Sequence, residues 1–373
     1  MYILIVSRGY PTPKNILSGI FEFDQAKALH SIGHKVVFAV IDFRSLRRYR
    51  KLGFSYLVKD GIKIYSLSIP LGRIPSWLML FIGKIGLSYL YKRIEKNEGR
   101  PDVVHAHFTI IGAFTSILKN KFHLPIILTE HSSLINKAKL KKSTSFFGRK
   151  AFNSCDKIIS VSSALSKRIY QHFGKESHII PNIVDTKVFK YNNKILKRDF
   201  RFISVGNLIE GKGHGLLIDA FINSKFNKNI YLDIIGNGPL HKHMQIKIDK
   251  ANVSNQIKLL GRLSRSETAK IMQQSDIFVL ASETETFGVV YIEALACGLP
   301  VIATLCGGPE DFINKDNGIF IPIKNIVALK EALLYMYSNN HIYNNKEISS
   351  KCKKKFNSET IALKLTHLYE TIL

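Results

Sequence analysis

Short apolar runs alternate with segments of helical periodicity along the first half of the chain. The apolar runs have the length and composition of buried strands and fall at residues 2–6, 35–41, 102–106, 125–129 and 157–161. Helical patterns follow the first and third of them, at residues 20–32 and 110–119. Strands that alternate with helices predict parallel βαβ units, so we expect a Rossmann-like α/β lobe.

The same rhythm restarts in the second half, after the polar run at 191–199. Strands are predicted at 200–205, 230–235, 256–260, 276–280 and 300–303. Helices are predicted at 213–223, 266–274 and 289–297, with a final amphipathic helix after the basic run Lys351–Lys355. We therefore expect a first Rossmann-like lobe at 1–185, a second at 186–355 and a C-terminal helix at 356–373 that packs back on the first lobe.

The size and composition of the chain agree with two globular lobes facing a cleft. Its 373 residues exceed one ordinary domain, and 46% hydrophobic residues suffice for two cores. The formal net charge of +26 has two interpretations. It is either a compositional drift over the whole surface or the mark of an anionic partner. A basic nucleic-acid-binding protein is an alternative, although no recognition motif accompanies the charge.

The four cysteines lack paired spacing and no secretory signal pattern opens the sequence, so we expect a cytoplasmic protein. The apolar stretch 74–91 is interrupted by Pro75, Gly83, Lys84 and Gly86 and is too short to span a bilayer. Basic or aromatic–basic segments at 44–51, 75–93 and 137–142 suggest peripheral contact with an anionic membrane surface. A lysine-rich composition explains the same segments equally well.

Two glutamates, Glu285 and Glu293, carry the strongest chemical signal. They lie in a segment that follows the predicted strand 276–280, where open α/β sheets bind ligands. Gly288 allows close approach of the backbone to a phosphate, and the helix that begins there directs its N–H groups at the same anion. We expect Glu285 beside a donor sugar and Glu293 at ribose hydroxyls. The competing interpretation, solvated surface charges, conflicts with the apolar helix around Glu293.

A second motif, Gly206–His214, joins a strand to a helix and contains Lys212. Lys212 is expected to neutralise charge on a β-phosphate leaving group. The motif also resembles the phosphate loop of nucleoside triphosphatases. Gly213, however, replaces the hydroxyl residue that such a loop needs on Mg²⁺, which disfavours an ATPase.

The segment around Glu285 and Glu293 resembles the E-x7-E signature of the retaining GT-B glycosyltransferases of glycosyltransferase family 4, the group 1 glycosyltransferases. The flanking motifs follow in the order typical of that family: Ile180–Asp185 with Phe189, Gly206–Lys212, Ile235–Pro239 and Gly307–Glu310. The resemblance implies a GT-B fold of two Rossmann-like lobes around a central cleft. It covers nearly the whole chain.

The resemblance also implies roles for individual residues. Glu285 and the backbone of Phe287, Gly288 and Val289 would hold the donor sugar and pyrophosphate, and Glu293 the ribose. Gly19 corresponds to a glycine near the pyrophosphate, although a plain turn explains it equally well. Leu124–Ser133 resembles the strand whose histidine, here His131, faces the donor sugar. A histidine held only by loop carbonyls is the competing interpretation.

One expected phosphate cation is missing, because Asn207 stands where relatives often carry arginine; Arg262 is a candidate replacement, and the backbone around Leu263 a candidate contact of the base. No D-x-D pair occurs in the chain, and His105 and His107 lack a third ligand at suitable spacing, so we expect neither a metal nor another cofactor.

These features predict a retaining glycosyltransferase that moves a hexose-type sugar from a nucleoside-diphosphate sugar to a saccharide or lipid-linked saccharide acceptor. Bacterial capsule, lipopolysaccharide or exopolysaccharide biosynthesis is the expected setting. The catalytic candidates are His131, Lys212 and Glu285, and no nucleic-acid partner is expected. A sugar-nucleotide epimerase or a phosphorylase of the same fold is the alternative.

Overall fold

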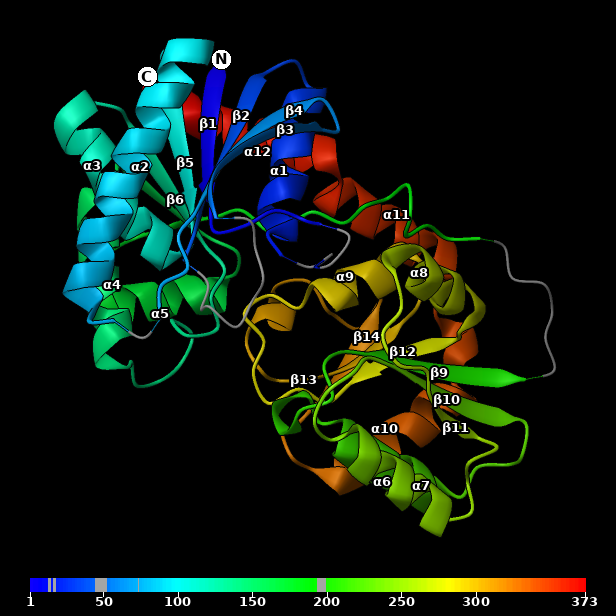
Figure 1. Ribbon diagram of the computed structural model, residues 1–373. Helices are drawn as coiled ribbons and strands as arrows, with labels where there is room; N and C mark the ends of the chain where they lie inside the picture. The colour runs from blue at the N-terminus through cyan, green and yellow to red at the C-terminus, as the bar shows by residue number, and fades with distance from the viewer. Residues whose placement is uncertain (13–14, 16–17, 44–51, 73, 193–198) are drawn as a thin grey trace. The chain divides into compact units, whose positions relative to one another are not determined.

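A computed structural model describes the chain except residues 13–14, 16–17, 44–51, 73 and 193–198. The chain forms two compact units (Figure 1). The N-terminal unit contains Met1–Ile183 and Ser358–Leu373, and the C-terminal unit contains Val184–Asn357. The final helix of the chain therefore belongs to the N-terminal unit.

The N-terminal unit is built on an eight-stranded sheet in the order β3-β4-β2-β1-β5-β6-β7-β8. Its strands are β1 (Tyr2–Ser7), β2 (Lys35–Asp42), β3 (Gly53–Lys59), β4 (Ile62–Ser68), β5 (Val103–His107), β6 (Ile126–Glu130), β7 (Lys157–Ser160) and β8 (His178–Ile179). Its helices are α1 (Ile20–Ser31), α2 (Ser76–Glu98), α3 (Thr109–Phe122), α4 (Lys142–Ser154), α5 (Ser163–Phe173) and α12 (Ser358–Glu370). All pairings except β3 with β4 are parallel.

Apolar side chains of the strands pack against α1 and α12 on one face of this sheet. Ile3, Ile5 and Phe38 contribute from the strands, and Phe23 and Leu365 from the two helices. The helices α2, α3 and α4 pack against one another in a separate group (Figure 1). A sheet covered by helices on both faces needs continuously apolar strands, which is why the strand runs could be read from the sequence.

An antiparallel hairpin, β3–β4, extends this sheet and was not predicted. Its two-residue turn is Asp60–Gly61, and both residues have positive φ, 50° and 77°. Asp-Gly is the usual sequence of such a turn, because both central residues need a left-handed backbone. The dipeptide was therefore the signal for the hairpin.

Residues 76–91 of the apolar stretch form the first part of the 23-residue helix α2. The glycines that interrupt it make room for neighbours: a Cβ on Gly83 would lie 2.6 Å from the Phe114 ring, and one on Gly86 would lie 3.2 Å from Leu67. Among the helices that the structure describes, none is both long and apolar enough to cross a membrane.

The C-terminal unit has a six-stranded parallel sheet in the order β11-β10-β9-β12-β13-β14. The strands are β9 (Phe200–Val205), β10 (Ile230–Ile235), β11 (Ile257–Leu259), β12 (Ile277–Leu280), β13 (Val301–Thr304) and β14 (Gly318–Ile321). The helices are α6 (His214–Ser224), α7 (His241–Lys250), α8 (Arg265–Gln274), α9 (Val289–Ala296), α10 (Ile326–Ser338) and α11 (Asn345–Phe356). Short 3-10 helices are η1 (Glu210–Lys212), η2 (Gly308–Asp311) and η3 (Asn340–Ile342).

The predicted alternation of strands and helices is confirmed in both units. Every strand expected from the sequence is present, with bounds that shift by one or two residues. The structure adds the hairpin β3–β4, the strands β8 and β14, and the helices α2, α4, α5, α7, α10 and α11. The basic segment 44–51 lies outside the described residues.

We expect Gly83→Ala to lower the free energy of unfolding by about 1–3 kcal/mol, because the new methyl group would overlap the buried Phe114 ring. Gly215→Ala in α6 is the matched control, since nothing lies within 4 Å of its Cβ and alanine favours a helix. Urea unfolding of both variants measures the difference. Equal effects at the two positions would show that α2 and α3 do not pack closely at Gly83.

Candidate functional site

The order of strands in the C-terminal unit reverses between β9 and β12. From β9 the chain adds β10 and β11 on one side, and then returns to add β12, β13 and β14 on the other. At such a reversal, α/β proteins bind ligands in a crevice at the carboxyl edge of the sheet, and the loops that follow β9 and β12 begin at this edge. Both glutamates and Lys212 follow these two strands.

Lys212 and Glu285 form an ion pair in this crevice. The Lys212 Nζ lies 2.5 Å from Glu285 Oε1, and the hydroxyl of Ser282 donates to the same oxygen at 2.7 Å. Glu285 is 8% exposed, so its charge is compensated by these partners and not by bulk water. Two residues 73 positions apart in the sequence are thus brought together.

Glycine brings the two loops into contact. Gly213 precedes α6 with φ 68°, and a Cβ there would lie 2.1 Å from the carbonyl oxygen of Ala281. The backbone N–H of Glu283 donates to the carbonyl of Gly211 at 3.0 Å. No larger residue fits at Gly213, so the sequence G-K-G fixes the position of Lys212 beside the loop after β12.

Helix α9 begins at this crevice. Its N-cap is Gly288 with φ 87°, and no side chain caps it. The loop before it is held by parallel bridging of Glu285 with Gly307, and by the packing of Gly308 against the backbone of Phe287. The first N–H groups of a helix lack intrahelical partners, so the N-terminus of α9 offers an anion hydrogen-bond donors and the positive end of the helix dipole.

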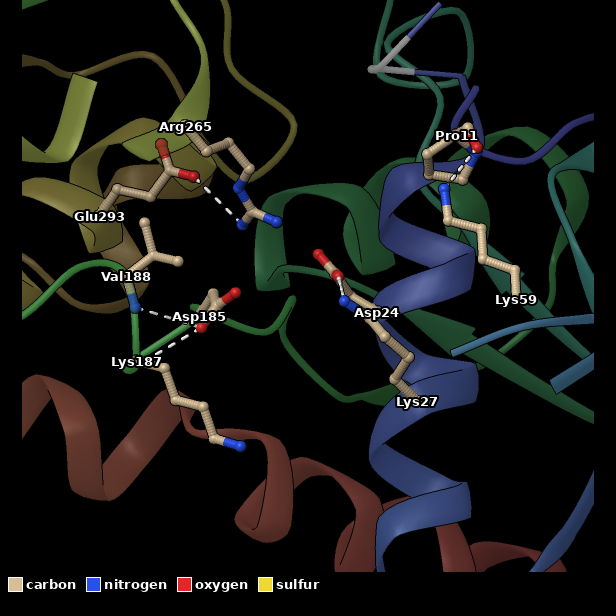
Figure 2. Close-up of polar contacts among 9 residues, drawn as sticks. All are labelled: Pro11, Asp24, Lys27, Lys59, Asp185, Lys187, Val188, Arg265 and Glu293. Atoms are coloured by element: carbon tan, nitrogen blue, oxygen red, sulfur yellow. Dashed lines mark hydrogen bonds and ion pairs between the residues drawn. The ribbon is translucent and has the colours of Figure 1, made fainter. Parts of the chain in front are cut away.

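Glu293 lies inside α9, 8% exposed, and its Oε1 is 3.4 Å from a guanidinium nitrogen of Arg265 (Figure 2). Arg265 opens helix α8 and also lies over the Phe189 ring at 5.7 Å. A charged partner compensates the carboxylate that the sequence places in an apolar helix.

Figure 2 also shows Asp185, near the start of the C-terminal unit. Its carboxylate accepts from the backbone N–H groups of Lys187 and Val188 at 3.1 and 3.4 Å.

Arg265 was not predicted; Arg262 was the candidate for the second phosphate cation. Arg262 and Leu263 lie on the loop after β11, and Arg262 is exposed. The available signal was the position of Arg265 at the first turn of a helix, directly after the capping residue Ser264. No local pattern identifies Glu293 as its partner, because the two residues belong to different helices, 28 positions apart in the sequence.

In the N-terminal unit, His131 lies directly after β6 in a group of buried rings. Its Nε2 is 3.1 Å from Nδ1 of His107, and its ring lies 5.2 Å from that of Phe108. Burial, together with the charge of Arg8, lowers the pKa of His131 to about 3. The imidazole is therefore neutral at physiological pH and can either donate or accept a hydrogen bond.

Glu130 orients the loop that carries His131. Its carboxylate accepts from the N–H groups of His131 and Ser132 at 2.8 and 2.6 Å, and from the N–H of Thr109 at 2.8 Å. Burial raises the pKa of Glu130, while these hydrogen bonds lower it. Glu130 was not predicted, because an acid at the end of an apolar strand has no distinctive pattern.

His105 and His107 share one face of β5, as their spacing predicted, with ring centroids 4.3 Å apart. His105 bonds to the hydroxyls of Thr129 and Tyr369, both at 2.7 Å. Within the described ranges of the chain, no group of three or more His, Cys, Asp or Glu side chains is placed to hold a metal ion.

Gly19 is the N-cap of α1, with φ 68°. A Cβ at this position would lie 2.0 Å from the carbonyl oxygen of Gly9, in the loop after β1. The glycine is required for this close approach. Gly19 and His131 belong to the N-terminal unit, and the remaining candidate residues belong to the C-terminal unit.

Two parallel-sheet α/β units, each with its chemical groups at the carboxyl edge of the sheet, define a protein of the GT-B class. The solved structure of HepE from Anabaena in complex with UDP and glucose has the same fold, with a TM-score of 0.74, 16% identity and full coverage of both chains. The predicted fold class is thereby confirmed.

The chain belongs to glycosyltransferase family 4, the group 1 glycosyltransferases. The model for Glycosyltransferase Family 4 matches residues 22–188, and that for Glycosyl transferases group 1 matches residues 185–355. An uncharacterized glycosyltransferase of Methanocaldococcus jannaschii is 34% identical over 77% of this chain and 82% of its own length. A putative teichuronic acid biosynthesis glycosyltransferase of Bacillus subtilis is 25% identical over 100% of this chain and 99% of its own. The protein is a glycosyltransferase.

We expect the stability of the N-terminal unit to depend on the neutral state of His131. Its folded-state pKa, about 3, lies below the unfolded value of about 6.5, so only the unfolded chain takes up a proton between them. Stability is therefore lost as the pH falls below about 6.5. Between about pH 7.5 and about pH 5.5, the wild type should lose about 1 kcal/mol more than His131→Asn.

Urea unfolding followed by circular dichroism at the two pH values measures this difference. The comparison with His131→Asn cancels the titration of other buried groups, including Glu22 and Glu130, whose pKa values burial raises. The same loss of stability in both proteins would refute the assignment.

Proposed function

We propose that the protein transfers a hexose-type sugar from a nucleoside-diphosphate sugar to a hydroxyl of an acceptor, with retention at the anomeric carbon. The observation that carries the proposal is the Lys212–Glu285 pair at the crevice where α9 begins. The Lys212 ammonium and the N-terminus of α9 suit a pyrophosphate, and the Glu285 carboxylate beside them suits the hydroxyls of a sugar linked to it. The HepE structure contains UDP and glucose, which supports a nucleotide-linked donor.

The pyrophosphate would bind the backbone N–H groups of Phe287, Gly288 and Val289 together with Lys212. Glu285 would accept from hydroxyls of the donor sugar. Because Lys212 already pairs with this carboxylate, it can hold Glu285 in place and turn toward the phosphate when the donor binds. The helix end and the ammonium would share the charge that develops on the departing diphosphate.

Glu293 would accept from the ribose hydroxyls, and Arg265 would hold its carboxylate in position. Arg262 and Leu263 would lie toward the base, where the exposed loop after β11 offers backbone groups. Gly19 would allow the loop after β1 to approach the pyrophosphate. Each motif of the sequence is thus assigned to one part of the donor: the ribose, the base or the pyrophosphate.

Retention would follow from departure of the diphosphate and attack of the acceptor hydroxyl on the same face of the sugar. The leaving phosphate oxygen would take the proton of the attacking hydroxyl, so no protein nucleophile is required. His131, neutral and held by Glu130 through the backbone, would bond to a hydroxyl of the transferred sugar. Positioning, and not proton transfer, suits a histidine whose pKa is about 3.

The acceptor would be a saccharide or lipid-linked saccharide of bacterial cell-surface polysaccharide synthesis. Similarity over the whole chain to a putative teichuronic acid biosynthesis glycosyltransferase supports this class of acceptor. Such an acceptor favours a cytoplasmic enzyme that contacts the inner face of the membrane.

Thermal shift with a panel of UDP-, GDP- and ADP-sugars tests the proposal, because a ligand that binds only the folded state raises its melting temperature. One donor class should raise it. Glu293→Ala should lower the affinity for that donor about 10- to 100-fold, the expected loss when hydrogen bonds to a carboxylate are removed. Glu331→Ala, an exposed glutamate of α10, is the matched control. An undiminished shift in Glu293→Ala would refute the ribose assignment.

We expect turnover to need Lys212 but no divalent metal, because the leaving charge is met by the ammonium and the end of α9. Lys212→Gln should lower kcat about 10²- to 10³-fold, and EDTA should leave wild-type kcat unchanged. Release of nucleoside diphosphate upon addition of acceptor measures both. Urea unfolding of Lys212→Gln shows whether the lost turnover comes with lost stability, because Glu285 would then lack its charged partner. Loss of wild-type turnover in EDTA, restored by Mg²⁺, would contradict metal independence.

A further inference from the structure

The outer face of helix α2 exposes four large apolar side chains at intervals of four residues. Trp77, Phe81, Ile85 and Tyr89 are 65%, 60%, 55% and 43% exposed. Residues four apart lie one above the next on a helix, so the four side chains form a continuous stripe. The opposite face of α2, which includes Leu80, Leu87, Leu90, Tyr91 and Ile94, is buried.

A basic cavity adjoins this stripe. It has a volume of about 600 Å³ and lies among α2, α3 and α4. It is lined by Lys84, Arg149 and Lys150, together with Lys119, which pairs with Asp156. Burial and the neighbouring charge of Lys150 lower the pKa of Lys84. Among the residues whose positions are described, no carboxylate lies within ion-pair distance of these first three cations.

The charged residues along most of α2 are basic. Its first 19 residues, Ser76–Ile94, contain Lys84, Lys92 and Arg93 and no acidic residue. Arg93 lies over the rings of Tyr89 and Phe54, at 5.0 and 4.6 Å, which anchors it beside the stripe. An exposed apolar stripe with a tryptophan and a tyrosine, flanked by cations, matches the interface of a bilayer that carries anionic headgroups.

We propose that α2 lies on the surface of an anionic phospholipid bilayer, with its stripe among the acyl chains and the cavity of Lys84, Arg149 and Lys150 on a lipid phosphate. This inference names the surface responsible for the membrane contact proposed above. Strand β4 is parallel to β1 and β2, so α2 begins at the carboxyl edge of the sheet, the edge that also carries His131. Docking by α2 would bring that edge toward the headgroups, where a lipid-linked acceptor presents its saccharide.

The chain contains a single tryptophan, and it is Trp77. Its fluorescence therefore reports directly on the stripe. The experiment mixes the full-length protein with phosphatidylcholine vesicles, with or without phosphatidylglycerol. Vesicles with the anionic lipid should shift the emission to the blue and protect Trp77 from acrylamide, whereas pure phosphatidylcholine should do so much less.

Two variants keep the reporter. Ile85→Glu should weaken binding at least about tenfold, because a charge enters the apolar contact. Lys84→Ala with Arg149→Ala should weaken binding to the anionic vesicles about 30-fold, about fivefold for each cation. The matched controls are Leu363→Glu, 55% exposed on α12, and Lys167→Ala with Arg168→Ala on α5, which should bind as the wild type does.

Three results would overturn the proposal. The first is that Trp77 emission does not change with anionic vesicles. The second is that Ile85→Glu, or the variant Lys84→Ala with Arg149→Ala, binds them as tightly as the wild type. The third is a blue shift without lipid that grows with protein concentration, since a second copy of the chain would then cover the stripe. Because the readout is lipid binding, failure here is distinct from failure of the donor-binding panel.

Discussion

The ion pair between Lys212 and Glu285 is the contact on which the arrangement of the C-terminal unit depends. A buried carboxylate needs a compensating charge, and this one obtains it from a loop that follows a different strand. The pair can form only because Gly213 lets that loop touch the backbone of Ala281. The end of α9 lies on the same loop as Glu285, so one contact fixes the cation, the acid and the helix N-terminus together.

The N-terminal unit meets the same requirement with neutral groups. His131 and His107 are kept uncharged by burial, and Glu130 receives three backbone N–H donors in place of a cation. Neutral imidazoles suit hydrogen bonds to sugar hydroxyls, whereas a lysine suits phosphate. In the proposed function, Lys212 would therefore meet the phosphate and His131 a hydroxyl of the sugar.

The positions of the strands and the two-lobed plan could be predicted because buried parallel strands are continuously apolar. The hairpin β3–β4 was missed although Asp60–Gly61 marks its turn, and α2 was missed because Gly83 and Gly86 resemble helix breakers in a sequence. These glycines serve tertiary packing, since each one makes room for the side chain of a neighbouring element. Arg265 was missed for a related reason: its partner, Glu293, belongs to another helix.

The sequence by itself determined the alternation of strands and helices and the family, and it pointed to Lys212, Glu285 and His131 as candidate site residues. Each of these depends on local spacing or on the order of motifs along the chain. Only the tertiary structure decided which charges meet, which histidines are neutral, and which face of α2 remains exposed. Pairing and burial depend on contacts between residues far apart in sequence, and periodicity alone carries no record of them.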